Sequence, residues 1–109
     1  MDRSNVITLL SRPGSQDENG IWHDGEEVRR QIFCQVDSVS RAEFFSAGQI
    51  GLKPEYRFTV FFGDYDDEEL VEYNGQVYSV YRTYHARKDE LELYVTRKEG
   101  IRNGAKDPG

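Results

Sequence analysis

The sequence predicts a mainly β fold, a small antiparallel β-barrel or sandwich of about six strands with one short inserted α-helix. Three observations support this fold class. An Asn-Gly pair at 74–75 separates two runs rich in Val and Tyr, aromatic residues make up 13% of the chain, and short alternating apolar segments recur along it. β-branched and aromatic residues favour strands. Because the chain has 109 residues, we expect residues 1–109 to form a single domain.

Asn74 and Gly75 predict a hairpin with a two-residue turn. Such a turn requires positive φ at both central residues, which Asn tolerates and Gly adopts freely. The turn fixes the register and places Tyr73 opposite Gln76. The more apolar face of the ribbon is then expected to be the core side, and it carries Val71, Tyr73, Tyr78, Val80 and Tyr84.

Four further segments predict strands. The segment at 6–10 is a short apolar run, and those at 29–36, 56–62 and 90–96 alternate with a period of two. Cys34 falls on the core face of the second segment, and Phe62 on the core face of the third. Since Cys34 is the only cysteine, no internal disulfide is possible. Residues 21–23 are expected to rejoin a sheet briefly.

A capping box at Ser40 and Glu43 predicts the start of the one helix. In this motif the Ser40 hydroxyl accepts from the backbone of Glu43, whose side chain reaches back to Ser40. The apolar residues at positions 44, 45 and 47 give the helix one apolar side. Gly48 is expected to end it in the left-handed conformation.

Three segments lack such periodicity. Residues 11–20, with Pro-Gly and Asn-Gly, predict a mobile loop, and residues 98–109 predict a frayed tail. The third segment is an acidic turn leading into the hairpin. Its carboxylates are Asp64, Asp66, Asp67, Glu68 and Glu69.

Residue types and spacing argue against catalysis. His23 and His85 are the only histidines, and both are expected in turns without a neighbouring Ser or Cys motif. One Cys and two distant His lack zinc spacing, and the acidic turn lacks the Gly and Glu positions of an EF-hand. We therefore expect no enzyme activity, no cofactor and no metal.

The net charge of −6 disfavours tight binding to duplex DNA, because neutralisation of phosphates by Lys and Arg supplies much of that affinity. The first residues lack a signal-peptide pattern, and no apolar run has membrane-spanning length, so we expect a cytosolic chain without a membrane role. Outward-facing aromatic side chains instead suggest protein–protein contact, namely those of Phe33, Tyr81 and Tyr94. Packing beneath the helix or long loops is the alternative, above all for Tyr81.

The order of these segments resembles the phage head-tail joining family, the small head-completion or stopper proteins of long-tailed phages. The resemblance covers roughly residues 6–95. It depends chiefly on the Ser-x-x-Glu helix start at 40–43 and the Tyr-Asn-Gly-Gln-Val-Tyr hairpin at 73–78, in this order and spacing. The acidic turn is a departure, since family members often have an Arg near the end of the preceding strand.

The resemblance implies a β-barrel subunit, without catalysis, that forms a ring in the virion of a phage or prophage. That ring would dock below the portal and adaptor proteins, close the DNA-filled head and bind the tail or a tail-completion protein. Before assembly the subunit would be a monomer in the host cytoplasm. Packaged DNA would pass through without specific binding. Because acidic residues in a channel repel phosphate, we expect that in such a ring the acidic turn at 64–69 faces the channel or an adjoining ring and stays solvated. The alternative is an outward solvated turn without a partner.

A second class stays open at this point, because small barrels host many functions. The chain could be an OB- or SH3-like binding module for single-stranded nucleic acid or a peptide. Basic pairs at 87–88 and 97–98 with nearby Tyr residues fit this alternative, since single strands bind basic grooves with stacking aromatics. Salt-dependent binding of single-stranded DNA would favour it.

Overall fold

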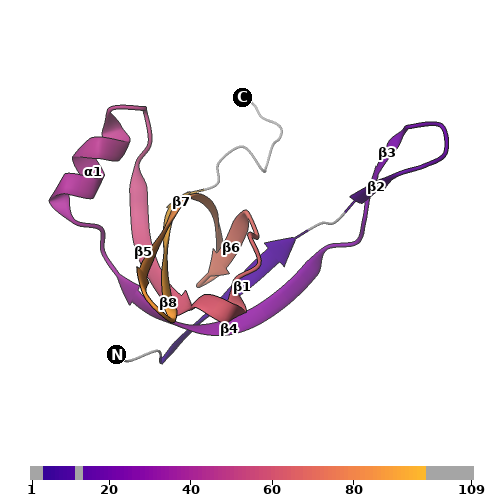
Figure 1. The fold of residues 1–109 in the computed structure, drawn as a ribbon. Helices are drawn as coiled ribbons and strands as arrows, with labels where there is room; N and C mark the ends of the chain where they lie inside the picture. The colour runs from indigo at the N-terminus through magenta and orange to yellow at the C-terminus, as the bar shows by residue number, and fades with distance from the viewer. Residues whose placement is uncertain (1–3, 12–13, 98–109) are drawn as a thin grey trace.

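The computed structural model describes residues 4–11 and 14–97. Six strands form a closed barrel in the order β1-β4-β5-β8-β7-β6, with β6 returning to β1, and every pairing is antiparallel (Figure 1). The elements are β1 (Asn5–Ser11), β2 (Gly14–Gln16), β3 (Trp22–Asp24), β4 (Val28–Asp37), α1 (Arg41–Gly48), β5 (Pro54–Phe61), the 3₁₀ turn η1 (Phe62–Asp64), β6 (Leu70–Tyr73), β7 (Gln76–Arg87) and β8 (Glu90–Arg97). The predicted fold class is confirmed. The predicted tail at 98–109 lies outside the described residues.

The hairpin of β6 and β7 turns where the sequence predicts. Asn74 has φ 52° and Gly75 has φ 80°, the positive values that this turn requires. Tyr73 pairs with Gln76, and Val71 with Tyr78. The predicted register is therefore confirmed.

The barrel interior is filled by alternate residues of the six strands. These core residues include Ile7, Leu9, Ile32, Cys34, Phe58, Val60, Val71, Tyr78, Leu91, Leu93 and Val95. Tyr56 packs edge-on against Tyr73 and Tyr78, with ring centroids 5.4 and 5.6 Å away. Burial raises the pKa of the Cys34 thiol to about 11, so this cysteine acts as a small core side chain.

A β-bulge in β7 overturns one predicted core position. The register with β8 shifts between Val80, which pairs with Val95, and Arg82, which pairs with Tyr94. The extra residue inverts the alternation of side chains beyond it. Tyr84 consequently lies on the outer face and is 54% exposed, so its assignment to the core was wrong.

The end of β5 also differs from the prediction. The strand stops at Phe61, and Phe62 begins η1 with its backbone N–H donating to the Asp89 carbonyl at 2.8 Å. The Phe62 ring stacks on His85 at 4.4 Å between centroids and is 48% exposed, so it is not a core residue. His85 belongs to β7, and His23 to β3, so neither lies in the predicted turn.

The predicted loop at 11–20 contains a strand. β2 pairs with β3 in a separate two-stranded hairpin, which we call the arm (residues 14–24) and which extends away from the barrel (Figure 1). The Asp17 carboxylate organises its turn by accepting from the backbone N–H groups of Asn19 and Ile21, each at 2.9 Å. Residues 22–24 pair with β2, so the expected return to a sheet is confirmed for Trp22 and His23, in this separate hairpin and not in the barrel. The mobility of this segment stays a prediction.

The helix begins as predicted and ends differently. The Ser40 hydroxyl accepts from the Glu43 backbone at 3.1 Å, which confirms the cap. Gly48 is the last helical residue, and the left-handed glycine is Gly51, with φ 83°. Of the helical residues only Ala47 is buried. Within the described ranges no helix has the length and apolar content needed to cross a bilayer.

Candidate functional site

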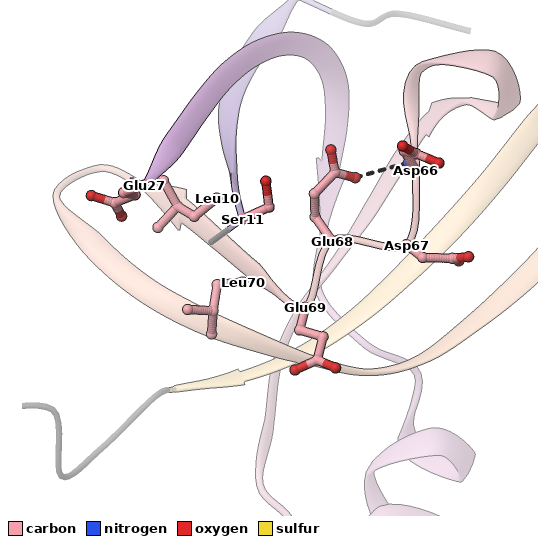
Figure 2. A pocket seen from close by; sticks show the side chains of 8 residues that line it. All are labelled: Leu10, Ser11, Glu27, Asp66, Asp67, Glu68, Glu69 and Leu70. Atoms are coloured by element: carbon pink, nitrogen blue, oxygen red, sulfur yellow. Dashed lines mark hydrogen bonds between the residues drawn. The ribbon is translucent and has the colours of Figure 1, made fainter. Parts of the chain in front are cut away.

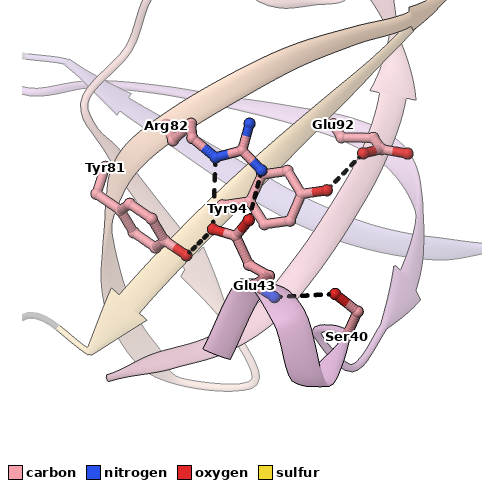
Figure 3. Close-up of polar contacts among 6 residues, drawn as sticks. All are labelled: Ser40, Glu43, Tyr81, Arg82, Glu92 and Tyr94. Carbon is pink, nitrogen blue, oxygen red and sulfur yellow. Dashed lines mark hydrogen bonds and ion pairs between the residues drawn. The ribbon is translucent and has the colours of Figure 1, made fainter. Parts of the chain in front are cut away.

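Three surface features of the barrel are candidates for function, and the first proves to be structural. Glu43 of α1 accepts a hydrogen bond from the Tyr81 hydroxyl at 2.6 Å and forms an ion pair with Arg82 at 2.5 Å (Figure 3). The Arg82 guanidinium lies 4.2 Å from the centre of the Tyr94 ring. The Tyr94 hydroxyl donates to Glu92 at 2.7 Å. These contacts attach the helix to the outer face of β7 and β8.

The electrostatics of this cluster agree with a structural role. The hydrogen bond from Arg82 holds the pKa of Glu43 below its ordinary value, so the carboxylate stays charged. Burial, and then the hydrogen bond to Glu43, raise the pKa of Tyr81, which keeps its proton and donates it. Tyr94 is only 7% exposed. The prediction of an exposed Tyr94 was therefore wrong, and Tyr81 follows the alternative of packing beneath the helix.

The second feature is a pocket of about 620 Å³ beside the acidic turn (Figure 2). β1 ends and β6 begins at this pocket, and the turn before β6 forms its acidic side. Leu10 and Leu70 supply apolar surface. Glu27 adds a carboxylate, and its position beside the acidic turn was not predicted from the sequence. The full lining is Leu10, Ser11, Glu27, Asp66, Asp67, Glu68, Glu69 and Leu70.

One of these carboxylates is structural. Glu68 has a side chain only 8% exposed, and it pairs with Arg30 at 2.6 Å and accepts from the Asp66 backbone at 2.8 Å. Burial alone would raise its pKa, but the hydrogen bonds from Arg30 and Asp66 outweigh burial and lower it. The Tyr65 hydroxyl donates to the Glu68 carbonyl at 2.5 Å. The expectation that the whole turn is solvated was therefore wrong for Glu68.

The other carboxylates of the turn differ in exposure. Asp66, Asp67 and Glu69 are exposed, and Asp64 is half-buried in η1. Among the described residues no group of three or more His, Cys, Asp or Glu side chains has the arrangement to hold a metal ion. The exposed carboxylates give this end of the barrel a negative rim.

The third feature is an exposed apolar row on the outer face of the barrel. Phe33 of β4 is 64% exposed and pairs with Val6 of β1, which is 42% exposed. The β4–β5 register pairs Cys34 with Val60, so Phe61 lies at the next position beside Phe33. Phe61 is 44% exposed, and Phe62 follows it. We call Val6, Phe33, Phe61 and Phe62 the apolar row.

The sequence prediction found one member of this row. Phe33 was predicted to be an outward-facing contact residue, and it is exposed as expected, although its role stays a prediction. Phe61 went unnoticed, although its place between Val60 and Phe62 in an alternating strand gives it an outward direction. A shallow hollow continues the row and is lined by Phe61, Phe62, Gly63, Lys88 and Asp89.

The arm carries further exposed apolar residues that sequence reasoning missed. Ile21 is 57% exposed and Trp22 is 59% exposed. The Trp22 ring lies over Gly14, where a Cβ would come within 2.4 Å of it, so this close approach requires glycine at position 14. The separation of Trp22 from the other apolar segments was the available signal, since an isolated aromatic in a polar segment has no core to join.

No known protein family and no curated protein matches this chain. Its own surface therefore carries the evidence on function. That evidence consists of a closed barrel, an acidic pocket, and apolar side chains exposed on the arm and on the row.

Proposed function

We propose that this chain is a structural head-tail connector subunit of a tailed phage or prophage. In this role it forms a ring below the portal and adaptor proteins, closes the DNA-filled head and provides a surface for the tail. The resemblance of residues 6–95 to the head-tail joining family motivates the proposal. The observation that supports it best is the exposure of large apolar side chains on the arm and on the row, because such exposure marks protein contacts.

The charge of the chain is compatible with a channel through which DNA passes. The net charge is −6, and the exposed carboxylates of Asp66, Asp67 and Glu69 lie close together. At physiological salt a charge acts over about 8 Å, so only carboxylates near the duplex would repel it. We place this negative rim at the channel or against an adjoining ring.

Co-sedimentation with purified capsids tests the proposal. The full chain is incubated with DNA-filled, tailless capsids that carry the portal and adaptor, and the capsids are pelleted. We expect the chain to pellet with them at a fixed ratio per capsid. Capsids that already carry tails are the control, since their connector surface is occupied. A chain that remains in the supernatant with both preparations would contradict the proposal.

A second candidate function is binding of single-stranded nucleic acid. The specific observation in its favour is that Lys88 lines the hollow beside Phe62, whose ring stacks on His85. Aromatic rings beside a cation are the elements of such sites. Binding of an oligonucleotide that weakens steeply with salt, together with no binding to capsids, would favour this candidate.

A further inference from the structure

We propose that the arm of one copy of this chain binds the outward side of helix α1 in a second copy. This inference rests on the proposed function and deepens it, because it names the surfaces that join neighbouring subunits. It follows from the direction in which the helix faces, from the unpaired charges of the two surfaces, and from their places at opposite ends of the molecule.

The side of α1 that faces away from the barrel is apolar. Glu43 binds side chains of β7, and Ala47, one turn later, is buried, so these two residues mark the side that faces the barrel (Figure 3). Residues three and four apart share one side of a helix, so Arg41, Phe44 and Phe45 lie together on the outward side. Phe44 is 47% exposed and Phe45 is 64% exposed. We call Arg41, Phe44 and Phe45 the helix face.

The helix and the turn that follows it carry an excess of positive charge. Arg41 and Lys53 are exposed, and neither forms an ion pair with another described residue. Ile50, in the same turn as Lys53, is 73% exposed and adds apolar surface. All the carboxylates of residues 37–55 are paired with arginines of the barrel strands, namely Asp37 with Arg57 at 3.3 Å, Glu43 with Arg82 at 2.5 Å and Glu55 with Arg97 at 3.8 Å.

The arm has the opposite charge. Ile21 and Trp22 expose 57% and 59% of their surface. Glu18 at the turn of the arm and Glu26 beside its base are exposed, and within the described ranges neither forms an ion pair. Residues 14–27 contain neither Lys nor Arg. The apolar residues and unpaired carboxylates of the arm therefore match the apolar residues and unpaired cations at α1.

The apolar row lacks this complement. The hollow beside it contains one cation, Lys88, and one carboxylate, Asp89, so their charges cancel. Arg87 lies outside the hollow and is paired with Glu90 at 3.5 Å. Charge therefore assigns the arm to the helix face and not to the row.

The arm and the helix face of one chain lie too far apart to touch. The arm ends at Asp24, before β4, whereas α1 begins at Arg41, after β4. The extended strand β4 spans about 30 Å at about 3.3 Å per residue. Figure 1 shows the arm and α1 at opposite ends of the molecule. The contact is therefore between two copies.

A contact between unlike surfaces propagates from copy to copy. Such head-to-tail interfaces close into rings when the rotation permits. A stable interface takes about 20–30 residues a side, more than one arm and one helix face offer. Isolated copies should therefore associate weakly, and a docking platform that concentrates them should promote the ring.

Exchanging the charges of the two surfaces tests this inference in the full-length chain. One variant reverses the arm by Glu18→Lys and Glu26→Lys, and the other reverses the charges at α1 by Arg41→Glu and Lys53→Glu. In sedimentation velocity each variant alone should associate at least about tenfold more weakly than wild type, because like charges then face one another. An equimolar mixture should recover the oligomers of wild type, because each positive arm meets a negative helix face and each negative arm meets a positive one.

Phe45→Ser removes apolar surface from the helix face, and Phe33→Ser is its matched control. Both side chains are 64% exposed, but Phe33 lies on β4 and not on α1. We expect Phe45→Ser to weaken association at least about tenfold, and Phe33→Ser to associate like wild type. Far-UV circular dichroism checks that every variant folds.

Wild-type association of Phe45→Ser, or of either charge variant alone, would overturn the inference. So would a mixture of the charge variants that fails to recover oligomers, or wild type that stays monomeric up to its solubility limit. Binding of wild type to vesicles of anionic phospholipid that depends on Phe45, without self-association, would assign the helix face to a lipid surface and would also overturn the inference. Capsid binding that survives such a result would leave the connector proposal standing, whereas oligomers without capsid binding would contradict the connector proposal alone.

Discussion

Single side chains decide where the helix sits on this barrel. Glu43 was predicted to complete a capping box, yet its carboxylate instead binds Tyr81 and Arg82. Ser40 alone supplies the side-chain cap described for α1. Two residues of one predicted motif therefore have separable roles, and each role has its own test.

Replacing the cap gives the simplest test at this scale. Ser40→Ala removes the acceptor of the Glu43 backbone N–H, and we expect it to lower the free energy of unfolding by about 0.5–2 kcal/mol. Chemical denaturation of variant and parent measures the difference. Coincident unfolding curves would show that this cap contributes nothing.

The charge of Glu43 gives a prediction about pH. Its pKa is lowered in the folded protein by Arg82, so its contribution to stability is full above the unfolded pKa, about 4.3, and is lost as pH falls through the folded value. Glu43→Gln should therefore be less stable than wild type at pH 7, and the difference should shrink below about pH 4. Denaturation at several pH values measures it.

Glu55→Gln is the matched control for that experiment. Glu55 pairs with Arg97 at 3.8 Å on the surface, and such exposed pairs contribute little. We expect its stability to follow wild type across the pH range. A Glu43→Gln difference that is independent of pH would contradict the proposed ion pair.

Among the elements, the hairpin of β6 and β7 depends on one glycine. Gly75 has φ 80°, and no atom lies within 4 Å of the place a Cβ would take, so a substitution is opposed by the backbone and not by neighbours. Gly75→Val should lower the free energy of unfolding by about 1–2 kcal/mol or more. Gly48→Ala, in a helix with equally open surroundings, should instead raise it by about 0.5–1 kcal/mol. Equal effects of the two variants would contradict this account of the turn.

Local signals predicted most of these elements, and long-range contacts explain the rest. The Asn74-Gly75 turn fixed its own register, and alternation located the core faces of β4 and β8. The bulge after Val80 was not predictable, because only the pairing of β7 with β8 reveals the extra residue, and that pairing cannot be deduced from the alternation of residue types along β7. The ion pair of Glu68 with Arg30 was not predictable either, because the two residues are far apart in sequence and meet only in the folded barrel.

The candidate site was predicted only in part. The acidic turn and Phe33 were found from composition and alternation, whereas the arm was read as a loop because Gly14 and the Asp17 turn resemble loop residues. Its strands depend on Asp17 contacts with the backbone and on packing of Trp22 over Gly14. These contacts form only in the folded arm, so the order of residues alone does not predict them.

At the scale of the whole molecule, the exposed carboxylates of the acidic turn have a predicted effect on DNA. Changing Asp66 and Asp67 to Asn and Glu69 to Gln removes charge, and Asn tolerates the φ of 62° at position 67. Glu68 is left intact because it is buried and paired with Arg30. In a phage that lacks the protein, this triple variant should fold normally and alter genome retention or ejection. If the variant phage shows wild-type titre and wild-type ejection kinetics, the predicted effect on DNA is contradicted, and the carboxylates contribute only to solubility.

The connector role is tested most directly by electron cryo-microscopy of DNA-filled, tailless capsids incubated with the full chain. We predict a ring of β-barrels below the portal and adaptor. Capsids that show no added density at the portal vertex, at protein concentrations that saturate any binding, would contradict the account.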